Sequence, residues 1–171
     1  FDYIKFENKK SVLYLMDSNN QYPMLSFGEY FNENIDDFKF PNNLKSLYTG
    51  MLFNQNIDNV KFPESLEEIN FGSTFCQKIH NISFPNNLKI LSFGYFYNQN
   101  MDNIRFPDSL IELYFGNNFN QKINKIHFGK NLKKINFGRC FNQNIDYLPE
   151  SLEELYLGKC YNKPINNLPN N

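Results

Sequence analysis

An apolar residue opens a new unit of this chain every 22 residues, and that period constrains the fold more than any single residue does. The units share the pattern LxxLxFGxxFNQxIxxhxFPx[NS], in which h is an apolar residue. A fixed period of this length is typical of a solenoid, in which each unit buries its apolar face by stacking on its neighbours. We predict coils that begin at Tyr22, Leu44, Leu66, Leu88, Leu110 and Leu132 and, after a shorter 20-residue step, at Leu152.

Each unit contains two short apolar groups of similar shape, LxxLxF and IxxhxF. Residues 66–71 illustrate the first group and residues 57–62 the second. The last three residues of each group alternate inward and outward, as in a half-buried strand. We therefore predict an all-β solenoid, a stack of about seven coils of 20–22 residues with two short parallel strands per coil and little or no helix.

Glycine and proline close the two groups. A backbone corner after the first group needs either a positive φ or a site without room for a Cβ, and both favour glycine. Proline after the second group fixes φ and cannot donate to a continuing ladder. Between the groups lies Phe-Asn-Gln, whose ring is expected to fill the interior while stacked asparagines bridge the turn backbones of adjacent coils. The glycines are Gly28, Gly50, Gly72, Gly94, Gly116, Gly138 and Gly158, and the prolines are Pro41, Pro63, Pro85, Pro107, Pro149 and Pro169.

The repeats divide the chain into a solenoid over residues 22–171 and a segment over residues 1–21 that is a partial repeat or an N-terminal cap. In this segment Phe1, Ile4 and Phe6 match IxxhxF, and residues 12–15 read as another strand. One break in the pattern is Phe128-Gly129, where other coils have Phe-Pro.

Composition narrows the function classes. With 17 basic and 18 acidic residues there is no bulk charge to attract nucleic acid. The chain contains no run of 18 apolar residues, which a membrane-spanning helix would need, so we expect no membrane partner. Three cysteines are too few for a secreted disulfide framework, which favours a reducing compartment and a cytoplasmic location.

These repeated residues resemble the FNIP repeat family, known from amoebae and from giant viruses that infect them, and the resemblance covers residues 22–171. FNIP repeats are grouped with leucine-rich repeats, and the IxxhxFPx[NS]L stretch, as in residues 57–66, is similar to the strand of the bacterial surface-antigen type of leucine-rich repeat. The resemblance implies a leucine-rich-repeat-like stack, in the host cytoplasm if the protein is viral. In several viral members the repeats follow an F-box, a helical motif that docks the adaptor of a ubiquitin ligase, which implies a role in substrate recognition.

Two rows of outward charge remain once the repeated positions are assigned to structure. One is mostly acidic and includes Asp36, Asp58 and Asp102, which we call the acidic row. The other is mostly basic and includes Lys39, Lys61 and Arg105, the basic row, with Ser83 between the last two. Either the rows neutralise each other across the strand ladder, or they form a partner-binding face whose charges select the partner.

The first strand offers further candidates for partner contact. Tyr48, Tyr114 and Tyr156 occupy an outward site and serve either as contact residues or as ordinary strand residues. Beside them, lysines and glutamates of alternating sign predict a stabilising ladder between coils. Large apolar residues also follow the glycine corner, and they are either an exposed patch or covered by the N-terminal segment. These are Tyr30, Met51, Leu52, Tyr95 and Phe96.

Catalytic and metal-binding patterns do not emerge from the sequence. His80 and His127 lie two coils apart, and no serine or cysteine is paired with a base. Cys140 and Cys160 occupy the same site in adjacent coils, which permits a disulfide, although two free thiols fit a reducing compartment better. We predict no cofactor, no metal and no enzymatic activity.

The leading functional prediction is therefore a protein-interaction module that presents its strand face to another protein. The resemblance implies a more specific form, in which the module is the substrate-recognition part of an F-box type ubiquitin ligase subunit. The alternative is a structural or virion-associated repeat protein that associates with itself end to end or laterally.

Overall fold

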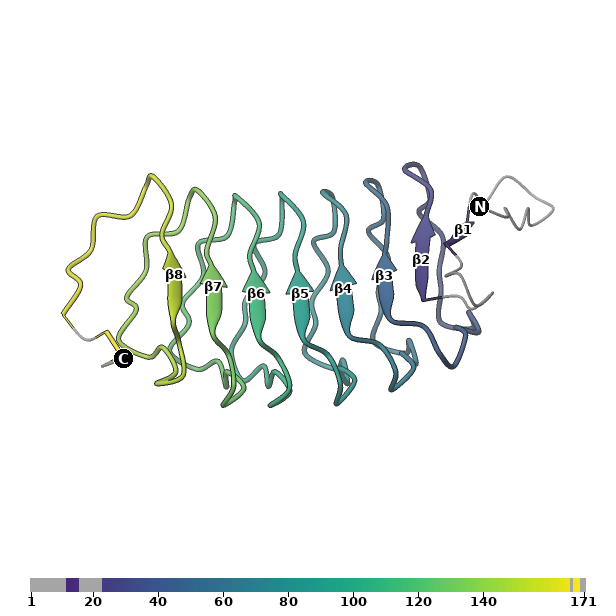
Figure 1. Cartoon of the computed structure of the whole chain (residues 1–171). Coiled ribbons are helices and arrows are strands. Elements are labelled where there is room, and N and C mark those ends of the chain that lie inside the picture. Colours follow the sequence, from purple (N-terminus) through teal and green to yellow (C-terminus); the bar gives the residue numbers. More distant parts are fainter. Residues whose placement is uncertain (1–11, 16–22, 167, 170–171) are drawn as a thin grey trace.

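The protein forms an elongated stack of coils with one strand from each coil side by side in a single sheet (Figure 1). The computed structural model describes residues 12–15, 23–166 and 168–169. The sheet has eight strands in chain order. They are β1 (Val12–Leu15), β2 (Met24–Phe27), β3 (Ser46–Tyr48), β4 (Glu68–Asn70), β5 (Ile90–Ser92), β6 (Glu112–Tyr114), β7 (Lys134–Asn136) and β8 (Glu154–Tyr156).

The repeat period sets the register of the sheet. Strands β2 to β8 are parallel, and each residue pairs with the residue one period later, as Leu47 pairs with Ile69 and Ile69 with Leu91. The central residue of each strand from β3 to β7 is buried while its two neighbours are half-buried. The predicted parallel β-solenoid is thus confirmed, and no helix occurs in the part of the chain that the structure describes.

The prediction of two strands per coil is wrong, because only the LxxLxF group forms a strand. Each IxxhxF group begins with a tight turn, in which the N–H of Val60, for example, donates to the carbonyl of Ile57 at 3.2 Å. The turn leaves only a short extended stretch before the proline. Within the described residues, strand-like pairing on this side is limited to one parallel bridge, between Arg105 and His127.

Aromatic rings fill the interior in a column that follows the stack. The rings of Phe53, Phe75 and Tyr97 are fully buried, and successive centroids lie 6.2 and 6.1 Å apart with nearly parallel planes. This confirms that the phenylalanine of Phe-Asn-Gln plugs the coil. Because each ring contacts the ring of the next coil, the core is continuous along the stack.

The asparagine after each ring bridges adjacent coils, as predicted. Asn98 Oδ1 accepts the backbone N–H of Asn120 at 2.9 Å, and Asn120 Oδ1 accepts that of Asn142 at 2.8 Å. The following glutamine adds a second bond, from Gln121 Nε2 to the Asn98 carbonyl at 3.2 Å. Cys76 interrupts this ladder, because its side chain has no oxygen to accept the N–H of Asn98.

The glycine corners need glycine for both predicted reasons, a positive φ and a lack of room for a Cβ. Gly50 has φ of 75°, the left-handed conformation that glycine adopts without cost. At Gly72 a Cβ would lie 1.4 Å from the carbonyl oxygen of Gly50, so the backbones approach too closely for any side chain. The same holds at Gly129, where a Cβ would lie 2.2 Å from the carbonyl oxygen of Pro107. This close approach explains the break in the Phe-Pro pattern.

The N-terminal part is described only in part. Residues 12–15 form the expected strand β1, which pairs antiparallel with β2, in contrast to all later pairs. The predicted matches at Phe1, Ile4 and Phe6 and the first coil start at Tyr22 lie outside the described residues. The boundary between residues 21 and 22 therefore stays a prediction.

Restoring the ladder at its gap should stabilise the protein. Cys76→Asn supplies an acceptor for the N–H of Asn98 and is expected to raise the free energy of unfolding by about 0.5–1.5 kcal/mol. Asn120→Ala, which removes a bridge, should lower it by about 1–2 kcal/mol. Urea denaturation of both variants measures the changes, and a destabilised Cys76→Asn would contradict the role assigned to this column.

Candidate partner-binding surfaces

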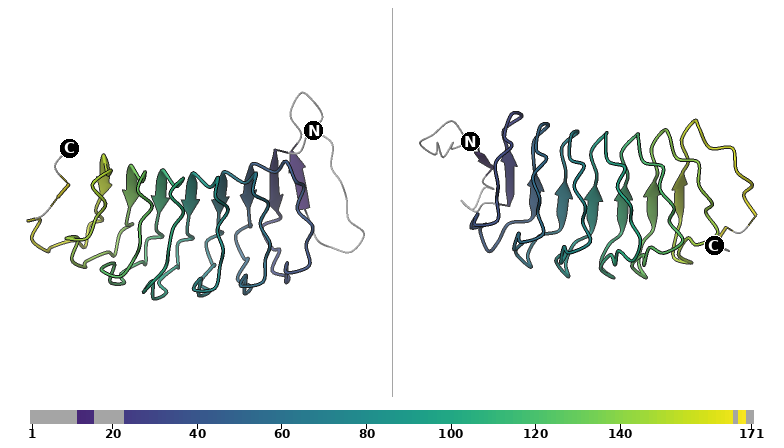
Figure 2. Two further views of the ribbon diagram at one scale, coloured as in Figure 1. Left: turned by 90° about the horizontal axis from the view of Figure 1, so that it is seen from below. Right: turned by 180° about the vertical axis from the view of Figure 1, so that it is seen from behind.

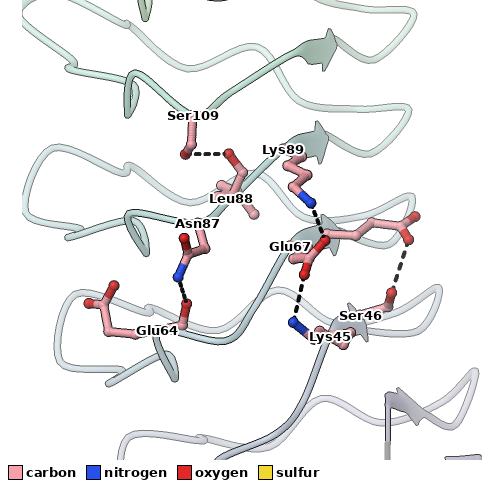
Figure 3. Close-up of polar contacts among 9 residues, drawn as sticks. Lys45, Ser46, Glu64, Glu67, Asn87, Leu88, Lys89 and Ser109 are labelled. Atoms are coloured by element: carbon pink, nitrogen blue, oxygen red, sulfur yellow. Dashed lines mark hydrogen bonds and ion pairs between the residues drawn. The ribbon is translucent and has the colours of Figure 1, made fainter.

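Charges on the strand face form a ladder of ion pairs between coils. Glu67 lies between Lys45 and Lys89 (Figure 3). Its Oε1 is 2.6 Å from Lys45 Nζ, and its Oε2 is 2.6 Å from Lys89 Nζ. Hydrogen bonds from the two lysines hold the pKa of Glu67 below its usual value. Lys133 and Glu153 form a similar pair at 2.7 Å. The predicted ladder of charges between coils is confirmed as a set of ion pairs.

The three tyrosines of the strand face bond to carboxylates of the same face. The Tyr48 hydroxyl donates to Glu68 Oε1 at 2.9 Å, and burial, followed by this bond, raises the pKa of Tyr48 to about 12. Tyr114 and Tyr156 each donate to the glutamate two residues earlier. Tyr156 is the most exposed of the three, at 48%. The polar groups of this face thus largely satisfy one another.

The acidic and basic rows lie on a different side, among the irregular segments that Figure 2 shows away from the strands. We call this side the loop face. Each of these acidic side chains accepts a hydrogen bond from the residue 23 positions later, in the next coil. The pairs are Asp36 with Asn59 at 3.4 Å, Asp58 with Asn81 at 3.3 Å and Asp102 with Lys125 at 3.3 Å. The acidic row therefore bonds along the stack.

The basic row makes no such bonds. Lys39, Lys61 and Arg105 are exposed, and none forms an ion pair with any residue that the structure describes. The interpretation that the two rows neutralise each other in pairs is therefore wrong. The reason is geometric, because the carboxylates turn toward the next coil instead of across their own.

An open groove crosses the loop face between these charges. Its larger part has a volume of about 860 Å³ and spans three coils, with walls from residues 58–64, 81–86 and 105–107. A second hollow of about 720 Å³ continues it toward Asp36 and Lys39, and both are lined by Asn59 and Lys61. The groove brings together five of the predicted partner-binding residues. Asp102 lines a separate hollow with Lys122 and Lys125.

The structure thus divides the nine predicted partner-binding residues between two faces. Six belong to the loop face, whereas Tyr48, Tyr114 and Tyr156 belong to the strand face. Sequence reasoning missed the apolar floor of the groove, Phe62, Ile82 and Phe84, because these residues match the repeat and were assigned to packing. The available signal was the residue that ends these segments, which is proline at positions 63 and 85 but glycine at position 129, where the backbone closely approaches Pro107.

The turns after the glycine corners form an exposed apolar edge. Tyr30 is 77% exposed, Met51 41%, Tyr95 45% and Phe96 51%, while Leu52 is half-buried. Of the two interpretations of these residues, exposure is the one observed. The turns of adjacent coils are joined by backbone bonds such as that from Phe96 N–H to the Ser73 carbonyl at 3.0 Å. This apolar edge is a second outward surface that packing does not explain.

The described residues offer no evident site for metal or thiol chemistry. No group of three or more histidine, cysteine, aspartate or glutamate side chains there is placed to hold a metal ion. Cys76, Cys140 and Cys160 are free thiols. No helix in the described part of the chain has the length and apolar character needed to cross a membrane.

The ion-pair ladder predicts a pH-dependent contribution of Glu67 to stability. Because its folded pKa lies below the unfolded value, the contribution is complete above the unfolded pKa and is lost as pH falls through the folded pKa. Glu67→Gln should lower the free energy of unfolding at pH 7 and low salt by roughly 0.5 kcal/mol, since exposed pairs are screened. The difference should shrink as pH falls below about 4.3, the ordinary pKa of a glutamate side chain.

Urea denaturation across this pH range checks the Glu67 prediction. Glu64→Gln is the matched control, because Glu64 accepts a bond from Asn86 but has no ion pair within the described residues. An equal pH dependence of both differences would contradict the ladder.

Comparison with known proteins agrees with this architecture. A family model described as the BspA type leucine rich repeat region matches six copies over residues 18–119 and 73–163. The crystal structure of CroV588, described as a novel circular LRR protein, is 34% identical with a TM-score of 0.50, over 85% of this chain and 28% of that one. The chain thus spans less than a third of that protein's length, and no curated protein matches it. With matched repeats over most of its length, the chain belongs to the BspA-type leucine-rich repeat family.

Proposed function

We propose that this chain is a non-enzymatic scaffold that binds another protein, and that the partner docks on the loop face. A leucine-rich repeat stack is suited to this task because its interior is filled and its outward positions are free to vary. One observation carries the choice of face. The cations of the strand face are paired, whereas Lys39, Lys61 and Arg105 border an open groove without an ion-pair partner in the described structure.

Unpaired charges at the rim of a groove favour binding more than paired ones do. A partner that reaches Lys61 gains an interaction without first breaking one in the scaffold, whereas contact with Lys45 must compete with Glu67. The side chains of the acidic row add acceptors along the same surface.

The FNIP-like motif supports a more specific form of this proposal. In it, the scaffold is the substrate-recognition part of an F-box type ubiquitin ligase subunit. The groove would then bind the substrate, and the adaptor would bind an F-box elsewhere in the parent protein.

Capture from an amoebal lysate tests the proposal. The immobilised protein is expected to retain a specific partner, and Lys61→Glu/Arg105→Glu should abolish retention because it reverses the free charges of the loop face. The control, Lys45→Glu/Lys133→Glu, changes the net charge equally on the strand face and should retain the partner. Thermal denaturation confirms that both variants are folded.

Each outcome of the capture experiment has a distinct meaning. Loss of the partner from the control variant alone would place the partner on the strand face. Failure of the wild type to capture any specific partner would count against the scaffold function. Identification of a ubiquitin-ligase adaptor with the parent protein would support the F-box form.

A structural role through self-association is the second candidate, and the exposed apolar edge of Tyr30, Met51, Tyr95 and Phe96 favours it. If the stacks pack laterally through this edge, sedimentation of the wild type will show concentration-dependent oligomers, and Tyr95→Ser/Phe96→Ser will restore the monomer. A monomeric wild type over the accessible concentrations would count against this role.

A further inference from the structure

The phenylalanines before the prolines form an outer column of rings that is broken at one place. The rings of Phe40 and Phe62 lie 5.9 Å apart, and those of Phe84 and Phe106 also lie 5.9 Å apart. Between Phe62 and Phe84, both half-buried, the described structure shows no ring contact. The larger part of the groove lies over this gap, with Ile82 also in its lining.

Backbone pairing between coils on the loop face is confined, among the described residues, to a later part of the stack. Farther along the stack, the N–H of His127 donates to the carbonyl of Ile104 at 2.9 Å, and the N–H of Phe106 donates to the carbonyl of His127 at 3.0 Å. These bonds hold two coils together on the loop face, at the place where Gly129 allows close approach. Among the described residues, no backbone bond joins residues 58–62 to residues 80–84. These two segments are joined by a side-chain bond instead, from Asn81 to Asp58 at 3.3 Å.

Charge is distributed unevenly around the gap. Lys61 lies on one side and Arg105 on the other, both in the groove lining and neither in an ion pair within the described structure. The nearby carboxylates already accept amide hydrogens, Asp58 from Asn81 and Glu64 from the backbone N–H of Asn86 at 3.1 Å. The groups left without partners around an apolar floor are thus cations.

We propose that this groove binds an extended protein segment in which an apolar side chain is flanked by carboxylates. The inference rests on the proposed scaffold function and names the chemistry of the partner at that site. The apolar side chain lies over Ile82 in the gap between Phe62 and Phe84, and the flanking carboxylates bond to Lys61 and Arg105.

The spacing of the cations sets the spacing of the carboxylates. Lys61 and Arg105 are two coils apart, which on the strand side corresponds to roughly 10 Å. An extended chain rises about 3.3 Å per residue, so carboxylates two to four residues apart span roughly 7–13 Å and match this separation. The segment lies along the stack and crosses Ser83, the neutral residue between the two cations.

The same surface is a poor fit for nucleic acid. A phosphate backbone presents a continuous line of negative charge, and the carboxylates of Asp58 and Glu64 in the groove lining would repel it. A short segment with two separate carboxylates meets the cations without passing over these groups.

A displayed library of random linear peptides, selected on the full chain, tests the partner chemistry. Selection should enrich sequences with an aromatic or large aliphatic residue flanked by aspartate or glutamate. The same selection on Lys61→Glu/Arg105→Glu should lose this enrichment, and selection on Lys45→Glu/Lys133→Glu should keep it. Enrichment of basic or uncharged sequences on the wild type would overturn the proposal.

Fluorescence anisotropy measures the affinity of the protein for a synthetic peptide in which glutamates flank a central phenylalanine. Lys61→Glu/Arg105→Glu should weaken binding about tenfold or more, and Ser83→Arg, which adds a cation between the two, should tighten it about threefold. Peptides with serine for phenylalanine or lysine for glutamate should bind at least about tenfold more weakly. Equal affinity of the wild type and the Lys61/Arg105 variant would overturn the inference.

The two proposals fail in different ways. A protein partner retained equally by the wild type and by Lys61→Glu/Arg105→Glu leaves the scaffold function intact and overturns the groove assignment. Absence of any protein partner, together with selective peptide binding, overturns the scaffold function while the groove chemistry stands.

Discussion

The structure depends on the bonds that each coil makes to the next. No coil closes a core of its own, because every buried ring contacts the rings of adjacent coils and every central strand residue pairs one period away. The asparagine ladder does the same for the turn backbones, whose N–H groups donate to the asparagine of the preceding coil. Loss of one bond at Cys76 is tolerated because the sheet and the ring column continue past it.

This dependence assigns most residues to architecture and leaves function to the outward positions. The strand face uses its charges to join coils, as Glu67 joins Lys45 and Lys89. A partner on that face would have to replace existing ion pairs. On the loop face few backbone bonds join the coils, and Lys39, Lys61 and Arg105 have no ion-pair partner within the described structure. A partner can therefore reach these three cations without replacing an existing ion pair.

Proline and glycine control this contact on the loop face. At Gly129 the absent side chain allows the backbone to approach Pro107, next to the bridge between Arg105 and His127. Pro63 and Pro85 end the two segments whose rings are not in contact, and each lacks the N–H that a continuing ladder would use. Gly129, in place of the usual proline, thus lies beside the one bridge between coils that the described residues show on this face.

The sequence by itself determined the solenoid, its register and its core, because a strict period can be satisfied only if identical positions stack. It also predicted the asparagine bridges and the glycine corners, since each of these meets a need that every coil shares. It did not reveal that IxxhxF forms a turn instead of a strand, because both structures bury the same apolar residues. Only the tertiary structure decided that Asp58 bonds to Asn81 while Lys61 stays unpaired, and that Phe62 and Phe84 are separated. Those outcomes depend on the direction of side chains and on the distance between coils, which a pattern of residue types does not specify.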